Sequence, residues 1–203
     1  MSAYPLMLQG DTLSVLVVGG GTVATRKAKG LVSSGATVHV VAPVLSADME
    51  SLATSSANVR VTRERYASTH IGDATLVIAA TDDAATNSRI AADARSLGRL
   101  VNVVSAPDEG NCISPAVHRI GDVIVAVSAG GVPTAAIRIR DALARTVDDR
   151  YADAVRELSS LRRALLDSGR HDEWSAATDA LIGDDFCALV ESGRFAEGVA
   201  AWR

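Results

Sequence analysis

Residues 13–24 read Leu-Ser-Val-Leu-Val-Val-Gly-Gly-Gly-Thr-Val-Ala. The apolar run at 13–18 ends in glycine, which is typical of a buried parallel strand. Residues 22–34 then carry Ala, Lys and Leu at helical spacing and stop at Gly35, a good helix terminator. This stretch therefore predicts a strand, a tight turn and a helix.

The glycines of this turn fit the pattern G-x-G-x-x-[GA]. The pattern alone is weak evidence, but here it follows an apolar strand directly and opens a helix. Gly19 permits the tight turn, Gly21 lets a pyrophosphate approach the backbone, and Ala24 keeps helix and strand close. We therefore expect a dinucleotide, NAD(H) or NADP(H), rather than a purely structural turn, on Gly19, Gly20, Gly21, Thr22, Val23 and Ala24.

Further strands and helices alternate along the first half of the chain. We expect strands at 37–41, 59–62, 75–80 and 100–104 and a helix at 84–97. This alternation predicts an α/β fold with a Rossmann-type doubly wound parallel sheet. Beyond Pro107, two β segments at 116–120 and 123–128 flank Gly121-Asp122, and from Thr134 the chain looks helical, with breaks near Gly169, Gly183 and Gly193. The expected domain bounds are 1–112 for nucleotide binding, a segment at 113–147 and a C-terminal helical region at 148–203.

Composition excludes several classes of protein. Hydrophobic residues make up 48% of the chain and aromatic residues only 3%, so Val, Ala, Leu and Ile must build the core. The net charge is −4, with +1 on residues 1–147 and −5 on the tail, which argues against a nucleic-acid surface. Cys112 and Cys187 lie far apart and support neither a disulfide framework nor a metal site. Without a leader or a long apolar run, we expect a cytoplasmic protein and no membrane contact.

Two segments near the expected sheet edge leave alternatives open. Val41-Ala42-Pro43 stands where a ribose-binding acidic residue or an arginine would be expected, so NAD and NADP are not distinguished. Thr81-Asp82-Asp83, with Asn87, follows another strand. This cluster suits a ligand at the sheet edge and suits a helix N-cap equally well.

A second glycine turn runs from Ser128 to Thr134, and arginines at 138, 140 and 145 follow it. Backbone amides at a helix start and guanidinium groups both favour anions, so the segment suits a ligand with several carboxylates. The alternative is a solvated basic face. The histidines show no metal-ligand spacing: His39 is expected to be structural, and His118 either faces a ligand or is simply exposed.

Several segments occur together in one order: residues 17–27, Val41-Ala42-Pro43, 79–83 with Asn87, 101–104, Ser114-Pro115-Ala116 and 128–131. As an ordered set they resemble the siroheme-synthase N-terminal module, the precorrin-2 dehydrogenase family, some of whose members are also sirohydrochlorin ferrochelatases. The resemblance covers about residues 4–146.

The resemblance implies an NAD-dependent oxidation of precorrin-2 to sirohydrochlorin and, in members with chelatase activity, insertion of ferrous iron. It also implies a homodimer in which the segment after the Rossmann unit, residues 113–147, interlocks with its partner and binds the tetrapyrrole. The substrate is a tetrapyrrole with eight carboxylates, which gives the arginines a purpose. Further cofactor residues are then Pro43, Thr81, Asp82 and Asn102, and substrate residues are His118, Ser128, Gly130, Gly131, Arg138 and Arg140; no metal ligands are expected.

One departure concerns catalysis. The family usually reads Asn-Val-Val-Asp where this chain has Asn102-Val103-Val104-Ser105. Serine is a poor ligand for iron and cannot replace the acid/base role proposed for that aspartate. Asp108 or Glu109, a few residues on, is the alternative source of a carboxylate, and the other alternative is that dehydrogenation needs only hydride transfer and a water. We expect dehydrogenation to survive better than chelation, and the candidate catalytic residues are Ser105 and Asp108. The alternatives are a carrier or sensor that has lost catalysis and a different Rossmann dehydrogenase, for whose substrate domain the chain has little room.

Overall fold

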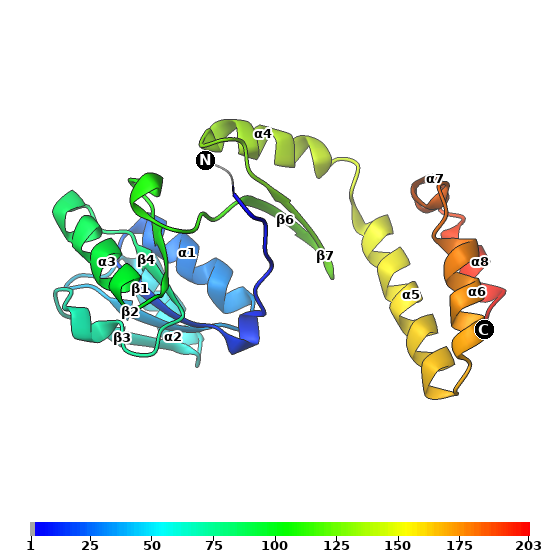
Figure 1. Ribbon diagram of the computed structural model, residues 1–203, viewed down its shortest axis with the longest axis horizontal. Helices are drawn as coiled ribbons and strands as arrows, with labels where there is room; N and C mark the ends of the chain where they lie inside the picture. Colours follow the sequence, from blue (N-terminus) through cyan, green and yellow to red (C-terminus); the bar gives the residue numbers. More distant parts are fainter. Residues whose placement is uncertain (1–2) are drawn as a thin grey trace. The chain divides into compact units, whose positions relative to one another are not determined.

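The computed structural model describes residues 3–203 and divides into two compact units, the first ending at Ser114 and the second running from Pro115 to Arg203 (Figure 1). Each unit has a hydrophobic core of its own. Within residues 3–203, no helix is both long enough and apolar enough to cross a membrane. The finer division near residue 147 that the sequence suggests stays a prediction.

The first unit is built on a parallel sheet with the strand order β3-β2-β1-β4-β5. Val18 at the end of β1 is in register with Val41 of β2 on one side and with Ala79 of β4 on the other. The carboxyl ends of these strands therefore form one edge. The doubly wound fold predicted from the sequence is confirmed, with strands β1 (Ser14–Val18), β2 (Thr37–Val41), β3 (Val59–Thr62), β4 (Leu76–Ala79) and β5 (Leu100–Val103).

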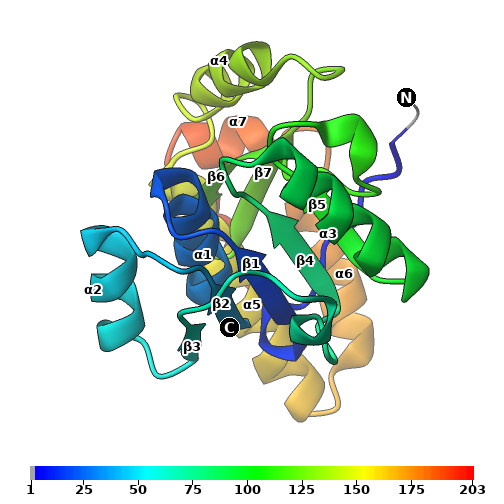
Figure 2. The ribbon, with the colours of Figure 1, turned by 90° about the vertical axis from the view of Figure 1, so that its left-hand side faces the viewer.

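Helices cover both faces of this sheet (Figure 2). Successive residues of β1 point to opposite faces: Val15 and Val17 belong to the core that includes Ala24 and Met49, whereas Leu16 and Val18 pack in the core that includes Ile90. Both faces of the strand are thus apolar, as a central parallel strand requires. The helices are α1 (Thr22–Ser33), α2 (Ala47–Ser55) and α3 (Ala84–Ser96).

The sequence pattern predicts no element in residues 44–58, yet α2 lies there. Its N-terminus is capped by Ser46, whose side chain accepts a hydrogen bond from the Met49 amide at 3.3 Å. Met49 and Leu52 bury the inner face of this short helix. Short 3₁₀ turns occupy Gly10–Thr12 (η1), Ser68–His70 (η2) and Pro107–Glu109 (η3).

The second unit joins a β-hairpin to a set of helices. Its strands are β6 (Ala116–Ile120) and β7 (Val123–Val127), and its helices are α4 (Pro133–Leu143), α5 (Asp149–Asp167), α6 (His171–Leu181), α7 (Phe186–Glu191) and α8 (Phe195–Ala200). Leu161, Leu165 and Val199 are among its buried core residues. The predicted breaks near Gly169, Gly183 and Gly193 are confirmed, and a further break separates α4 from α5.

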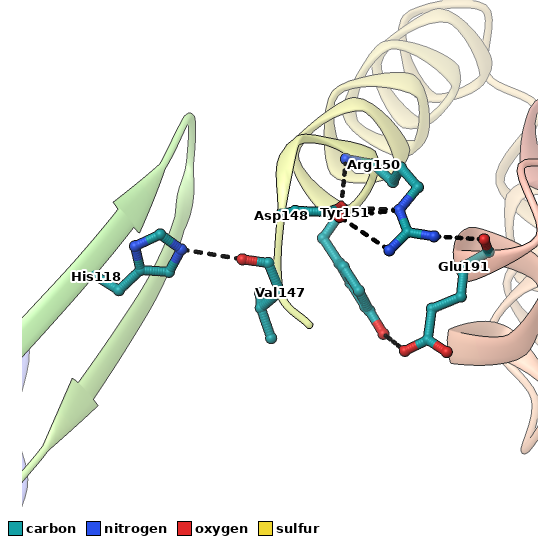
Figure 3. A network of polar contacts seen from close by, with 6 residues as sticks. All are labelled: His118, Val147, Asp148, Arg150, Tyr151 and Glu191. Carbon is teal, nitrogen blue, oxygen red and sulfur yellow. Dashed lines mark hydrogen bonds and ion pairs between the residues drawn. The ribbon is translucent and has the colours of Figure 1, made fainter. Parts of the chain in front are cut away.

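A polar network fixes the start of α5 (Figure 3). Asp148 caps the helix by accepting from the Arg150 amide at 3.1 Å, and the Arg150 guanidinium also binds this carboxylate. Arg150 donates to the carbonyl of Glu191, and the Tyr151 hydroxyl donates to the Glu191 carboxylate at 2.9 Å. These contacts hold α7 against the first turn of α5.

His39 on β2 has an environment that makes the stability of the first unit depend on pH. Arg60 donates to Nδ1 of His39 at 2.9 Å, and since arginine has no acceptor, Nδ1 must be unprotonated. The proton then lies on Nε2, which is 2.9 Å from the Thr62 hydroxyl. Burial, together with the smaller effects of the neighbouring Arg60 and His70, lowers the pKa of His39 to about 4. His39 is thus a neutral, structural residue, as expected.

Because the pKa of His39 lies below the value of about 6.5 for unfolded histidine, folding favours the neutral form. Its contribution to stability is complete above about pH 6.5 and is lost as the pH falls toward 4. We expect His39→Gln to flatten the decline in the urea midpoint over this range, whereas His171→Gln, at an exposed histidine, leaves the decline unchanged. Identical pH profiles for wild type and His39→Gln would contradict this assignment.

Candidate functional site

The carboxyl ends of β1, β4 and β5 bring three loop segments to one edge of the sheet. The glycine turn follows β1, Thr81 to Asp83 follow β4, and Ser105 lies just beyond β5. The strand order reverses between β1 and β4, and ligands of doubly wound sheets bind in the crevice at such a point. The edge is therefore the candidate site.

Two glycines of the turn are required by packing. Gly19 has φ +130°, and a Cβ atom there would lie 2.3 Å from the carbonyl oxygen of Ala80. A Cβ atom on Gly20 would lie 2.1 Å from the carbonyl oxygen of Val44, and the Ser46 amide donates to the Gly20 carbonyl at 2.8 Å. The turn is thus clamped between the end of β4 and the segment that leads into α2.

Gly21 is different, because nothing in the fold demands glycine there. Its φ of −83° and ψ of −175° are accessible to any residue, and a Cβ atom would meet no other atom within 4 Å. Gly21 is also the N-cap of α1. In the described part of the chain, the amides of Thr22, Val23 and Ala24 bond to no protein acceptor. An open approach to unpaired helix amides is the cradle that a pyrophosphate requires, so the predicted cofactor residues fit this group.

Ala24 fulfils its predicted packing role, since it is fully buried between α1 and the sheet. Beyond β2, Pro43 is exposed and the segment 42–45 carries no charged side chain. The end of β2 therefore offers neither a carboxylate for a ribose hydroxyl nor a cation for a 2′-phosphate.

At the end of β4, the cap and the polar cluster are both present. The Asp83 carboxylate accepts from the Thr86 amide at 3.1 Å and from the Thr86 hydroxyl, and these bonds lower the pKa of Asp83. Asp83 is thus the N-cap of α3. Asp82 is exposed, and Thr81 turns toward α3 instead. The cap explanation holds for Asp83 and leaves the exposed Asp82 for another role, whereas Thr81 is bonded to Asn87.

Asn87 connects Thr81 to Ser105. Its Oδ1 accepts from the Thr81 amide at 3.1 Å and from the Thr81 hydroxyl at 2.8 Å. Its Nδ2 donates to the Thr81 carbonyl at 3.0 Å and to Ser105 Oγ at 3.3 Å. Asn87 is only 2% exposed, whereas Ser105 is exposed. Asn87 is a site residue that the sequence pattern places beside the cluster but does not predict as a ligand contact.

Asn102 on β5 presents an unpaired acceptor. It is 6% exposed, and its Nδ2 donates to the Cys112 carbonyl at 3.1 Å. Its Oδ1 is buried and has no partner in the described residues. Lys27 of α1 is also half-buried, and burial lowers its pKa. A buried acceptor without a donor indicates a place where a ligand group could complete the hydrogen bonding. Asp108, by contrast, is exposed in η3.

The predicted substrate residues all lie in the second unit. His118 on β6 is half-buried, and its Nε2 lies 3.0 Å from the Val147 carbonyl (Figure 3). Ser128, Gly130 and Gly131 form the exposed turn before α4. Arg140 binds Asp141, whereas Arg138 is exposed and joins no ion pair within the described residues. Arg138 is therefore the better placed of the two to bind an external anion.

In residues 3–203 no group of three or more histidine, cysteine or acidic side chains is arranged to hold a metal ion. Apart from the exposed Asp82 and the helix cap Asp83, the polar groups described at the sheet edge are amides and hydroxyls. These groups suit the recognition of an anion or an amide.

Comparisons with known proteins point in one direction. Residues 6–116 match a family model described as putative NAD(P)-binding. The chain is 38% identical over 168 residues to a siroheme synthase of Saccharophagus degradans, which covers 82% of this chain and 36% of that protein. It is 32% identical over 200 residues to a siroheme synthase of Nitrosomonas europaea, covering 96% of this chain and 41% of that protein. The chain thus spans well under half the length of these curated relatives.

A solved structure is similar over the whole chain. It is described as SirC, precorrin-2 dehydrogenase, and it matches with a TM-score of 0.75 and 29% sequence identity. The match covers 98% of this chain and 100% of that one. The architecture of both units therefore recurs in a protein of similar extent.

Proposed function

The chain belongs to the family of putative NAD(P)-binding modules, as its resemblance to the siroheme-synthase N-terminal module predicts, and we propose that it oxidises precorrin-2 to sirohydrochlorin with NAD⁺. Gly21 carries the proposal. It is a glycine that the fold does not need, and it caps the helix α1, whose first amides are unpaired within the described residues. The whole-length similarity to a precorrin-2 dehydrogenase supports this substrate.

Residues of the sheet edge would hold the cofactor. The turn Gly19 to Gly21 and the first amides of α1 would bind the pyrophosphate. The acceptor Oδ1 of Asn102 is available to an amide donor. NAD⁺, when bound, supplies the hydride acceptor for this two-electron oxidation, while the substrate loses the accompanying proton to solvent or to a nearby base. The protein side chains then have to hold the substrate carbon in line with the nicotinamide ring.

The tetrapyrrole would be held through its carboxylates. In the second unit, Arg138 and the amides of the turn 128–131 are groups that bind such anions. We propose that the protein is cytoplasmic, because its two cysteines are free thiols and thiols stay reduced in that compartment. Ferrous iron remains an additional substrate to be tested, because Ser105 replaces the family's aspartate.

The experiment mixes the pure chain with precorrin-2 and NAD⁺ without oxygen and follows the absorbance of sirohydrochlorin and of NADH. We expect both products to appear in equal amounts and faster than in a reaction without protein. NADP⁺ in place of NAD⁺ decides cofactor preference, and added Fe²⁺ tests for siroheme. Absence of NADH formation would overturn the proposal, and tight sirohydrochlorin binding without turnover would favour a carrier.

We further propose that the chain forms a homodimer through the hairpin and α4. This helix exposes Ile137, Ile139 and Leu143 at 43%, 47% and 40%, and both strands of the hairpin are only partly covered. Apolar residues gathered in this way favour a protein interface. A second copy is the expected partner, because most soluble oligomers are symmetric dimers of one chain.

The variant Ile139→Asp tests this interface. In a twofold dimer the substitution is present on both sides of the interface. We therefore expect the dissociation constant of the dimer to rise roughly a hundredfold. Light scattering after size exclusion should give a dimer for wild type and a monomer for the variant. Ile182→Asp is the matched control, since Ile182 is 46% exposed but lies outside α4. A monomeric wild type, or a variant that remains dimeric, would reject the interface.

A further inference from the structure

The orientation of the Asn87 side chain is fixed by chemistry. The atom nearest the Thr81 amide, at 3.1 Å, must be an acceptor, because a backbone N–H only donates. That atom is Oδ1, so the other arm is the NH₂ group. Nδ2 therefore donates to both of its neighbours, the Thr81 carbonyl and Ser105 Oγ. Since Asn87 is 2% exposed and bonds through every arm, its side chain has one stable orientation.

This orientation determines what the Ser105 hydroxyl does. Because Ser105 Oγ accepts from Asn87, one lone pair is occupied and the hydroxyl proton must point elsewhere. In the described residues no protein acceptor takes this proton, and Ser105 is exposed. Asn87 thus presents Ser105 as a donor to whatever approaches the sheet edge.

The position of Ser105 in the fold indicates which ligand it faces. In this fold the pyrophosphate lies at the turn after β1 and the adenosine half extends toward β2, so the reactive half lies over β4 and β5. Ser105 follows β5 directly. It therefore lies at the end of the site where substrate meets cofactor, and a hydroxyl donor there pairs best with a carboxylate.

We propose that Asn87 is a positioning residue that holds Ser105 as a hydrogen-bond donor to a carboxylate of the tetrapyrrole, an assignment that rests on the proposed function. Ser105 then contributes to substrate binding, and proton transfer lies with another group. The position for which the resemblance implies an acid/base then serves recognition in this chain.

The test uses the intact chain and separates binding from turnover. Ser105→Ala should raise the Kd of sirohydrochlorin and the KM for precorrin-2 by about tenfold, the usual effect of losing a hydrogen bond to a charged group. The kcat and the Kd of NAD⁺ should stay within about twofold. Ser105→Thr, which keeps the hydroxyl, should bind like wild type, as should Ser96→Ala, a control at an exposed serine of α3.

Asn87→Asp tests the positioning. The carboxylate still accepts from Thr81, but it also accepts the Ser105 hydroxyl proton and so turns this donor away from the ligand. We expect the same tenfold loss of sirohydrochlorin affinity as in Ser105→Ala, and no additional loss in the double variant. Should Asn87→Asp not fold, the side-chain amide resonances of Asn87 replace it, since removal of Ser105 Oγ must shift one of them.

Each outcome is decisive. Unchanged sirohydrochlorin affinity in Ser105→Ala, a weakened NAD⁺ affinity instead, additive losses in the double variant or unshifted amide resonances overturn the assignment. If wild type binds sirohydrochlorin but the variants give one of these results, the role of Ser105 and Asn87 is rejected and the proposed function still stands. If wild type does not bind sirohydrochlorin, both fall together.

Discussion

Replacing Gly19 with alanine is expected to destabilise the first unit by at least about 3 kcal/mol, because two unfavourable effects coincide. The backbone of Gly19 has φ +130°, a region that L-residues rarely adopt. The new methyl group would also lie 2.3 Å from the Ala80 carbonyl oxygen. Relief of this clash requires β1 and β4 to separate at their carboxyl ends. Amide hydrogen exchange should show early loss of protection in these two strands.

The control for this variant is Gly30→Ala. Gly30 lies inside α1, and a Cβ atom there meets nothing within 4 Å. Alanine is the better helix former, so this change should stabilise the unit by about 0.5–1 kcal/mol. Trp174 and Trp202 both lie in the second unit, so their fluorescence follows that unit separately. Wild-type protection of β1 and β4 in Gly19→Ala would contradict the packing described for the turn.

Local patterns predicted the elements of the first unit well. The apolar runs that form β1 and β4 are buried on both faces, so their composition identifies them without knowledge of their neighbours. Gly35 and Gly98 mark the ends of α1 and α3 for a local reason as well, since each follows the last helical turn. The α2 helix was not predicted because it is short and buries only Met49 and Leu52, so it carries little helical periodicity.

The sequence could not reveal contacts that depend on strand order. Asn87 and Ser105 are 18 residues apart. They meet because β4 and β5 are adjacent, α3 follows the end of β4, and Ser105 follows the end of β5. Similarly, Asn102 reads like any polar residue in a strand until its Oδ1 is found buried without a partner. The glycine pattern assigned the tight turn to Gly19 and the ligand to Gly21, but it could not show that Gly20 is required by packing against Val44 while Gly21 has open space.

This difference among the glycines gives the last prediction. Gly21→Ala should fold like wild type, because its backbone angles suit alanine and its Cβ has open space. The methyl group would nevertheless stand where the pyrophosphate has to reach the amides of α1. A clash of about 1–3 kcal/mol weakens binding by roughly tenfold to a hundredfold. Titration of NADH by its fluorescence measures this loss, and a thermal melt within about 2 °C of wild type confirms that the fold is intact.

Gly30→Ala again supplies the control, since it makes the same substitution in the same helix away from the sheet edge, and its NADH affinity should equal that of wild type. The comparison distinguishes a purely structural glycine turn from a ligand-binding one, which the sequence alone does not. If the turn were purely structural, substitutions would affect binding only in proportion to their effect on stability, and Gly21→Ala would bind NADH normally. If Gly21 is glycine for the sake of a ligand, affinity falls while stability stays. Equal NADH affinity in Gly21→Ala and Gly30→Ala would remove the observation on which the proposed dehydrogenase rests.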